Sequence, residues 1–195
     1  YYCVFLIFIS YKINGNNWNF LRANYMVFLN FEIVTPNLGI WWYFFIEMFT
    51  EFIPFFKGAF GLFLFSFVIP LTIRFCGQPF YVSIVILGWL ILTKPYPVLG
   101  DYGFWFSFLA YFVPVAGYMR YKVFAMLLFI HGIMLSPIFY HLWIGSGSGN
   151  SNFFYAVSLV NALAIGTILS DLIWAMLRHE YDGETPNYDV KLAQV

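Results

Sequence analysis

Two asparagines, Asn150 and Asn152, are the side chains of this sequence best suited to hold a polar ligand. They lie at the end of the stretch GSGSGNSN (145–152), which separates two long apolar runs. A side-chain amide both donates and accepts hydrogen bonds, so it suits sugar hydroxyls or a phosphate, and a helix N-terminus after the asparagines would attract an anion. Asn is also typical of glycine-rich turns, because it tolerates left-handed backbone angles. A ligand site and a plain turn are both open interpretations at this point.

Three aromatic residues, Phe153, Phe154 and Tyr155, follow the asparagines directly. Aromatic rings are enriched where a membrane meets water, and there they would lie beside an acyl chain or a sugar face. Polar amides followed by aromatic rings match the layers of a lipid that carries a glycosylated, phosphorylated head group.

A second polar stretch, KPYPVLGD (94–101), joins two other apolar runs. Pro95 and Pro97 stiffen it, and Lys94 and Asp101 give it opposite charges. The stretch is either a rigid turn whose charged ends reach toward water or a second wall of a head-group site, with Lys94 and Asp101 facing the ligand.

Charged side chains inside apolar runs need partners, because a carboxylate at the centre of a membrane costs about 2.5–3.5 kcal/mol on insertion scales. Glu47 lies near the middle of a predicted span, and Glu51 follows one helical turn later on the same face. This pair could perform acid–base chemistry or bind a cation, and a structural polar cluster is the alternative. We expect Asp171, near the end of the last apolar run, to form a hydrogen bond between helices.

The remaining reactive side chains form no pattern that predicts a catalytic residue, a metal site or a cofactor. His131 and His141 are ten residues apart and do not share a helix face as a zinc pair would. Cys3 and Cys76 form no CxxC pair, and the sequence holds no nucleophile elbow, phosphate-binding loop or dinucleotide fingerprint.

The composition identifies the solvent around these residues. Of the 195 residues, 62% are hydrophobic and only 9% are charged, whereas soluble domains carry about 25% charged residues. Such a surface suits lipid, so we predict an all-α, polytopic transmembrane helix bundle. The net charge of zero gives no electrostatic reason to expect a nucleic-acid partner.

The bundle is predicted to occupy residues 1–177, as the C-terminal part of a longer protein, followed by a polar cytosolic tail at 178–195. About six full spans are expected, of which one is short for a membrane crossing. The predicted spans are 38–56, 59–73, 80–93 (the short one), 103–117, 123–144 and 153–177.

Three features are expected before and between the first spans. Residues 19–34 could form an interfacial or re-entrant segment. Thr35 is expected to cap the first full span, with Pro36 at its first helical position, and Lys57-Gly58 to form a tight joint between the first two spans.

The lysine and arginine positions predict the orientation. If every span crosses, seven basic residues collect on one side and two on the other, which is a clear positive-inside bias. The hairpin 145–152 and the turn 94–101 then both face away from the cytosol. The cytosolic side receives Lys12, Arg22, Arg74, Arg120, Lys122, Arg178 and Lys191, and the opposite side receives Lys57 and Lys94.

Four longer stretches resemble a known family. They are TPNLGIWWYFFIEMF (35–49), KPYPVLGD (94–101), HLWIGSGSGNSNFFYA (141–156) and LSDLIWAMLRHEY (169–181). In this order they resemble the PIG-U family, the multi-spanning subunits of the glycosylphosphatidylinositol (GPI) transamidase of the endoplasmic reticulum membrane.

The resemblance implies a non-catalytic function and a set of partners. In this family the subunit recognises the GPI lipid for attachment of the anchor to proteins, the catalytic cysteine belongs to the protease-like partner PIG-K, and PIG-T is a further subunit. The implied fold is similar to that of the GT-C-type mannosyltransferases of GPI synthesis. The family's Asn-Ser-Asn motif, which contacts the GPI head, maps onto Asn150 and Asn152. Family members tend to have a bulkier residue where this chain has Gly145 and Ser146, so a looser hairpin is expected here.

Two other function classes are alternatives. A dolichol-dependent mannosyltransferase of GPI synthesis needs a luminal acidic base, for which Asp101 is the candidate in this chain. A transporter or channel would use Glu47, Asp171 and His131, but these residues lie on three different predicted spans and at different depths.

Overall fold

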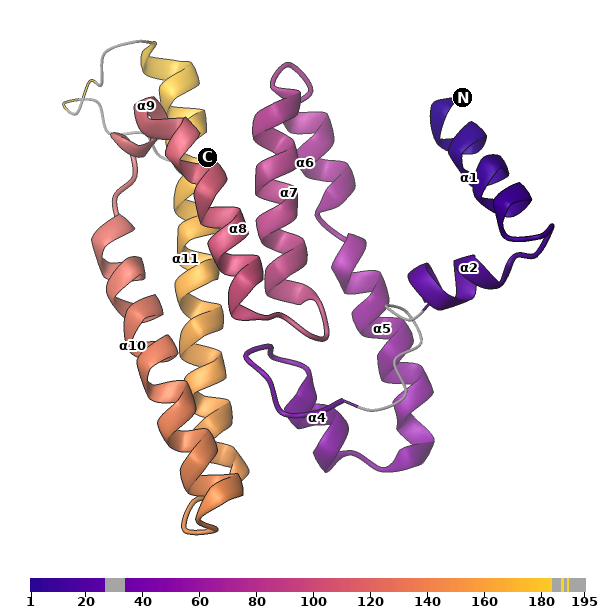
Figure 1. The fold of residues 1–195 in the computed structure, drawn as a ribbon. Helices are drawn as coiled ribbons and strands as arrows, with labels where there is room; N and C mark the ends of the chain where they lie inside the picture. Colours follow the sequence, from indigo (N-terminus) through magenta and orange to yellow (C-terminus); the bar gives the residue numbers. More distant parts are fainter. Residues whose placement is uncertain (27–33, 184–186, 188, 190–195) are drawn as a thin grey trace.

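The structure is a computed structural model that describes residues 1–26, 34–183, 187 and 189 (Figure 1). Every regular element in these ranges is a helix, which confirms the predicted all-α class. Three helical stretches among them are long and apolar enough to cross a membrane, rather than the six expected from the sequence. These are Thr50–Arg74, Lys122–Gly145 and Ser151–Asp182.

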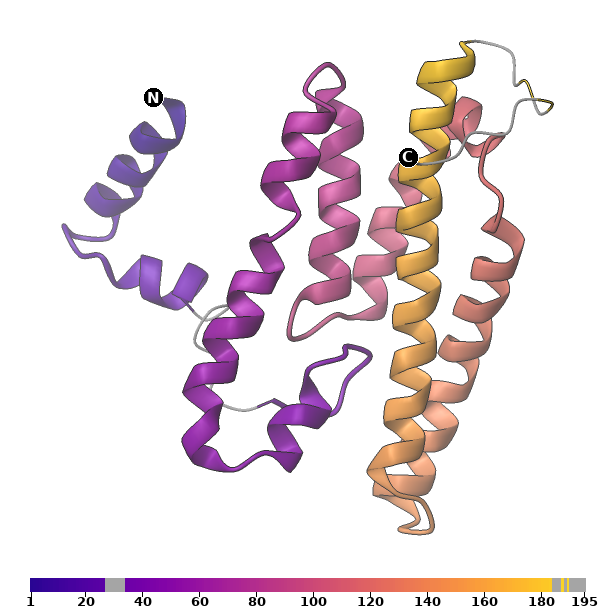
Figure 2. The same cartoon turned by 180° about the vertical axis from the view of Figure 1, so that it is seen from behind.

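Two of these stretches form an antiparallel hairpin (Figure 2). α10 (Lys122–Tyr140) continues into the π-helix η4 (His141–Gly145), and α11 (Ser151–Asp182) returns along it. A side chain at Gly132 of α10 would overlap the amide of Asn161 on α11, so only glycine permits this approach. Close contact at small residues holds helices together in lipid, where the hydrophobic effect does not drive them together.

The predicted spans 123–144 and 153–177 are therefore confirmed as helices. α11 continues through Asp182, and Arg178 forms an ion pair with Asp182 inside its last turn. The division into a bundle at 1–177 and a cytosolic tail at 178–195 stays a prediction.

A second helical hairpin packs on α11 (Figure 1). It consists of α7 (Pro79–Thr93) and α8 (Leu99–Leu109), joined by the turn 94–98. The Trp105 ring occupies the space that a side chain at Gly88 would need, and its Nε1 donates a hydrogen bond to the Ile84 carbonyl oxygen at 2.9 Å. The short predicted span 80–93 is thus a helix, as expected.

Two prolines explain two interruptions that the predicted spans did not include. The stretch 50–74 begins with η2 (Thr50–Phe52) and then divides into α5 (Ile53–Phe65) and α6 (Val68–Arg74). Further along the chain, α8 is followed by η3 (Ala110–Phe112) and α9 (Val113–Ala116). A proline removes the hydrogen bond to the carbonyl four residues earlier, and its ring clashes with that carbonyl. Pro70 acts in this way on Ser66, and Pro114 on Ala110. The expected joint at Lys57-Gly58 is wrong, because both residues lie inside α5.

The predicted span 38–56 is also wrong. Only α4 (Trp42–Glu47) is helical in its first part, residues 34–41 are irregular, and Met48 and Phe49 are extended. Thr35 accordingly caps no helix. The segment 34–47 instead lies across the bundle near the turn 94–98 and beside the start of α11, as Figure 2 shows.

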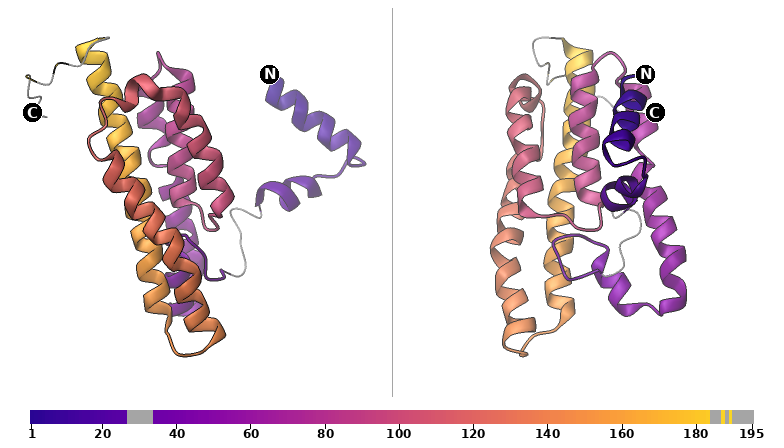
Figure 3. Two further views of the ribbon diagram at one scale, coloured as in Figure 1. Left: turned by 60° about the vertical axis from the view of Figure 1, so that its left-hand side comes forward. Right: turned by 45° about the vertical axis from the view of Figure 1, so that its right-hand side comes forward.

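The N-terminal helices stand apart from the bundle (Figure 3, left). They are α1 (Tyr2–Ile13), α2 (Asn19–Leu21) and the π-helix η1 (Arg22–Met26), and none of them has a buried residue. The segment predicted at 19–34 is helical as far as Met26, and its part at 27–33 lies outside the described residues.

Candidate functional site: the hairpin end of the bundle

The hairpin between α10 and α11 is a tight turn that Asn150 closes. Gly147 has φ +62°, a backbone angle that favours glycine, and the amides of Ser148 and Gly149 both donate to the Leu142 carbonyl oxygen. The Asn150 side-chain oxygen accepts a hydrogen bond from the Phe153 amide at 3.3 Å and so caps α11. Asn150 therefore performs the turn-forming function that the sequence left open, and its side-chain oxygen is engaged.

Asn152 is held in a different way, by a residue far away in the sequence. The Tyr43 hydroxyl on α4 donates a hydrogen bond to Asn152 Oδ1 at 2.6 Å. The Tyr43 ring stacks on the Tyr155 ring, with centroids 4.3 Å apart and planes at 14°, and the Tyr155 hydroxyl donates to the Ile40 carbonyl oxygen. The amide oxygen of Asn152 is thus occupied, while among the described residues its Nδ2 donates to no partner. Donation is the function left to this exposed amide.

An aromatic cluster lies beneath the two asparagines. Trp42 is fully buried, and its ring packs within 5.4–5.7 Å, between centroids, of Trp143, Phe154 and Tyr155. Its Nε1 is a buried donor without an acceptor in the described chain. Such groups are uncommon, since most buried polar atoms are paired. Trp42 and Tyr43 were missed as site residues because the sequence placed both on a membrane span.

The irregular segment 34–41 explains how α4 reaches this position. Asn37 Nδ2 donates to the carbonyl oxygens of Thr35 at 2.9 Å and Pro95 at 3.1 Å, and Asn37 Oδ1 accepts from the Gly39 amide. The Ser158 hydroxyl on α11 donates to the Asn37 carbonyl oxygen at 3.2 Å. The polar groups of this segment thus pair with the turn 94–98 and with α11, which replaces the helical bonding expected from its apolar sequence.

Lys94 and Asp101, the predicted second wall, bind each other. Lys94 Nζ lies 2.5 Å from Asp101 Oδ2, and the same oxygen accepts a hydrogen bond from the Val98 amide at 2.7 Å at the start of α8. The segment 34–41 contacts the turn that they brace, and it leads directly to α4, which contacts Asn152. The structure therefore links the two predicted parts of the site through residues 34–47 rather than placing them face to face (Figure 2).

The charged groups predicted inside the membrane have separate positions. Glu47 ends α4 and Glu51 lies in η2, with extended residues between them, so the predicted same-face carboxylate pair is wrong; both side chains are exposed. Asp171 is buried, and its oxygens accept hydrogen bonds from the amides of Arg120 and Tyr121 at 3.0 and 2.8 Å. This contact between α11 and the start of α10 confirms the expected hydrogen bond.

The histidines also lie apart from any shared centre. His131 is exposed, and its Nδ1 lies 2.7 Å from the Leu127 carbonyl oxygen within its own helix. His141 lies in η4, beside Gly145. Within the described ranges, no three His, Cys, Asp or Glu side chains are grouped so that they could hold a metal ion.

Comparison with known proteins identifies the family. Residues 1–161 match the family model described as GPI transamidase subunit PIG-U. The chain belongs to the PIG-U family. The resemblance carried by the motifs at 35–49, 94–101 and 141–156 is thereby confirmed, because all three lie within the matched residues.

Individual members of the PIG-U family match over most of this chain. It is 58% identical to the GPI transamidase component GAB1 of Saccharomyces cerevisiae, over 97% of this chain and 48% of that protein. It is 36% identical to the GAB1 homolog of Schizosaccharomyces pombe, over 92% of this chain and 44% of that protein. It is 34% identical to the human GPI-anchor transamidase component PIGU, over 85% of this chain and 38% of that protein. The chain thus spans less than half the length of these relatives. All three relatives are named as transamidase components, and none of these names supports the mannosyltransferase alternative.

Proposed function

We propose that this chain is part of a non-catalytic GPI transamidase subunit and that its hairpin end binds the GPI lipid in the endoplasmic reticulum membrane. The observation that carries the proposal is the hydrogen bond from Tyr43 to Asn152. It fixes the amide at the tip of the bundle so that its two N–H groups are available to a ligand. The proposal extends the family membership, which by itself names only the complex.

The chemistry of the site matches a GPI head group. Phosphate and sugar oxygens are hydrogen-bond acceptors, and the oriented Asn152 Nδ2 is a donor. The first amide N–H groups of α11 point out of the N-terminal end of the helix, and the helix dipole places partial positive charge at that end. Both favour an anionic group there. The tip of α11 thus offers hydrogen-bond donors to a glycan joined to a phosphate. The side-chain oxygens of Asn150 and Asn152 do not compete for these donors, because both already accept hydrogen bonds.

The lipid portion of GPI is matched by the apolar surface next to the tip. Leu142, Ile144 and Phe153 are exposed large hydrophobic residues around the hairpin, outside the buried Trp42 cluster. Such residues are suited to contact acyl chains at the membrane boundary. Lys94 and Asp101 enter the proposal as a brace, because their ion pair holds the turn that positions the segment carrying Tyr43.

The partners follow from the same proposal. A subunit that presents the GPI lipid leaves the bond-breaking step to another chain, and the resemblance assigns it to the cysteine of PIG-K, with PIG-T as a further partner. The chain would lie in the membrane as a multi-pass component, in keeping with its three long apolar helices.

The proposal is tested by crosslinking a photoactivatable GPI analogue to the full-length protein in its assembled complex. Asn152→Asp keeps the oxygen that accepts from Tyr43 but replaces the donating group with a second, negatively charged oxygen. We expect this variant to lose most of the crosslink while the complex assembles normally. Asn24→Asp, at an exposed asparagine of η1, is the matched control and should crosslink like the wild type. An undiminished crosslink in Asn152→Asp would refute the proposal.

A further inference from the structure

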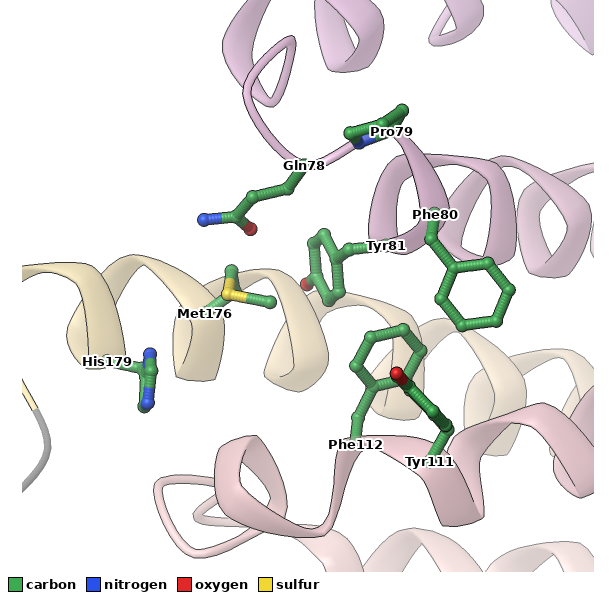
Figure 4. Close-up of a pocket in the computed structure, with 8 residues that line it drawn as sticks. All are labelled: Gln78, Pro79, Phe80, Tyr81, Tyr111, Phe112, Met176 and His179. Atoms are coloured by element: carbon green, nitrogen blue, oxygen red, sulfur yellow. The ribbon is translucent and has the colours of Figure 1, made fainter.

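A groove lies at the end of the bundle opposite the hairpin (Figure 4). It has a volume of about 630 Å³ and is formed by the start of α7, the η3 region and the last turns of α11. Its size falls in the range of about 300–1,000 Å³ that is usual for small-molecule sites. The proposed GPI site uses none of its residues.

Aromatic rings form the walls of this groove. Tyr81 and Phe112 meet edge to face with centroids 5.3 Å apart, and Phe80 packs against Phe112 at 5.7 Å. Met176 of α11 lies between these rings and the polar end of the groove, as Figure 4 shows. The walls thus suit a rigid apolar body, since aromatic rings that pack on one another leave little freedom to reshape the groove.

The polar end of the groove contains an acceptor without a donor. Gln78 Nε2 donates to Glu180 Oε1 at 2.9 Å, and this carboxylate fixes which end of the amide is nitrogen. The opposite atom, Gln78 Oε1, is buried and accepts no hydrogen bond from the described residues. A buried acceptor of this kind costs free energy until a donor reaches it.

Several other side chains near this end already have partners. Arg74 forms an ion pair with Glu180 at 2.8 Å, and the Tyr81 hydroxyl donates to the Leu172 carbonyl oxygen at 2.8 Å. His179 packs edge-on against the Tyr118 ring. No lysine or arginine is among the described residues that line the groove, so the groove favours a neutral ligand with a hydroxyl donor over a phosphate head group.

We propose that this groove binds a sterol, with the sterol hydroxyl donating to Gln78 Oε1 and the ring system lying between Phe80, Phe112 and Met176. A sterol combines a rigid apolar body with a single hydroxyl, and this hydroxyl can donate to the buried Gln78 Oε1. A diacylglycerol also has a hydroxyl, but it would bring two ester carbonyls to a site whose Tyr81 and Gln78 donors are already engaged. We expect the end of α6, which carries the exposed Arg74, to lie near the boundary between membrane and water, where a sterol hydroxyl also lies.

The first test varies the ligand and leaves the protein unchanged. A photoreactive sterol is added to the full-length protein in its complex, and the labelled residues are mapped. We expect labelling within residues 78–81, 111–112 and 176–179, and we expect excess unlabelled sterol to prevent it. The sterol methyl ether has no hydroxyl donor and should be at least several-fold less effective as a competitor. Absence of label from these segments, or competition by diacylglycerol but not by sterol, would overturn the proposal.

The second test removes the acceptor. Gln78→Leu keeps a side chain of similar bulk, and it should weaken sterol labelling roughly two- to tenfold, the loss expected for one neutral hydrogen bond. Ser83→Leu places the same side chain five residues further along the chain, in α7 and outside the groove, and it should label like the wild type. Undiminished labelling in Gln78→Leu would overturn the assignment, whatever the outcome of GPI crosslinking.

Discussion

The two ends of the bundle are organised by different kinds of interaction. At the hairpin end, the contacts that position Asn152 are made by neutral groups, which are the amide of Asn37 and the hydroxyls of Tyr43 and Tyr155. At the opposite end, carboxylates dominate: Asp171 binds the amides that precede α10, and Glu180 and Asp182 pair with arginines. The charged end joins helices to one another, whereas the neutral end presents a donor to the surface.

This difference separates stability from GPI binding. Substitutions at the charged end should change the free energy of unfolding, and substitutions at Tyr43 or Asn152 should change GPI binding with little effect on folding.

The largest effect is expected for Asp171→Leu. Two part-buried amides, those of Arg120 and Tyr121, would lose their acceptor, which should destabilise the protein by roughly 2 kcal/mol. A lower midpoint of thermal unfolding of the purified complex measures this. Asp171→Asn, which keeps one accepting oxygen, should fall between this variant and the wild type. Thr167→Val, one turn earlier on α11, should match the wild type; equal stability in Asp171→Leu would contradict the account.

A smaller, functional effect is expected for Tyr43→Phe. The variant keeps the ring that stacks on Tyr155 and loses only the hydrogen bond to Asn152, worth about 1 kcal/mol. GPI crosslinking should fall up to roughly fivefold, while the midpoint of thermal unfolding stays close to that of the wild type. Tyr121→Phe, at an exposed tyrosine of the charged end, is the control. A large loss of stability with normal crosslinking would reverse the proposed division between the ends.

A still smaller effect is expected for Lys94→Met. The side chains of Lys94 and Asp101 are 28% and 24% exposed, so solvent screens their ion pair and its loss should cost at most about 1 kcal/mol. Asp101→Asn should cost more, because it also weakens the bond to the Val98 amide. Thermal unfolding of the two variants, compared side by side, measures this order, and an unchanged unfolding midpoint in both variants would show that the pair does not brace the turn.

The smallest effect is expected for Arg74→Met. The Arg74 side chain is 54% exposed, and exposed ion pairs contribute about 0–1 kcal/mol. We therefore expect the free energy of unfolding to fall by about a few tenths of a kcal/mol at most. Glu180 would retain its hydrogen bond from Gln78. A drop in the unfolding midpoint as large as that of Asp171→Leu would show that this surface pair is structurally essential.

The sequence predicted the elements whose structure depends on local signals. The helices at 80–93 and 123–144 were predicted because their apolar runs end at proline or glycine-rich turns, and Asp171 because a carboxylate in an apolar helix needs a partner. The interruptions near Ser66 and Ala110 could have been predicted from Pro70 and Pro114.

The arrangement of the candidate site could not be predicted in the same way. Tyr43 and Asn152 are 109 positions apart, and no spacing rule brings them together. The segment 34–41 has the apolar composition of a membrane helix, yet its few polar groups, chiefly Asn37, bond to Pro95 and Ser158 instead. Tertiary hydrogen bonds thus override the local preference, and they become visible only when the chain is folded.

The central claim, that the hairpin end holds the GPI head group, is tested most directly by mapping the attachment point of a GPI analogue whose photoreactive group is on the head. The measurement uses the wild-type protein in its assembled complex and identifies the labelled residues by mass spectrometry. Label is expected on Tyr43 and on residues 150–155. Label confined to the groove around Gln78, or found only on other subunits, would contradict it.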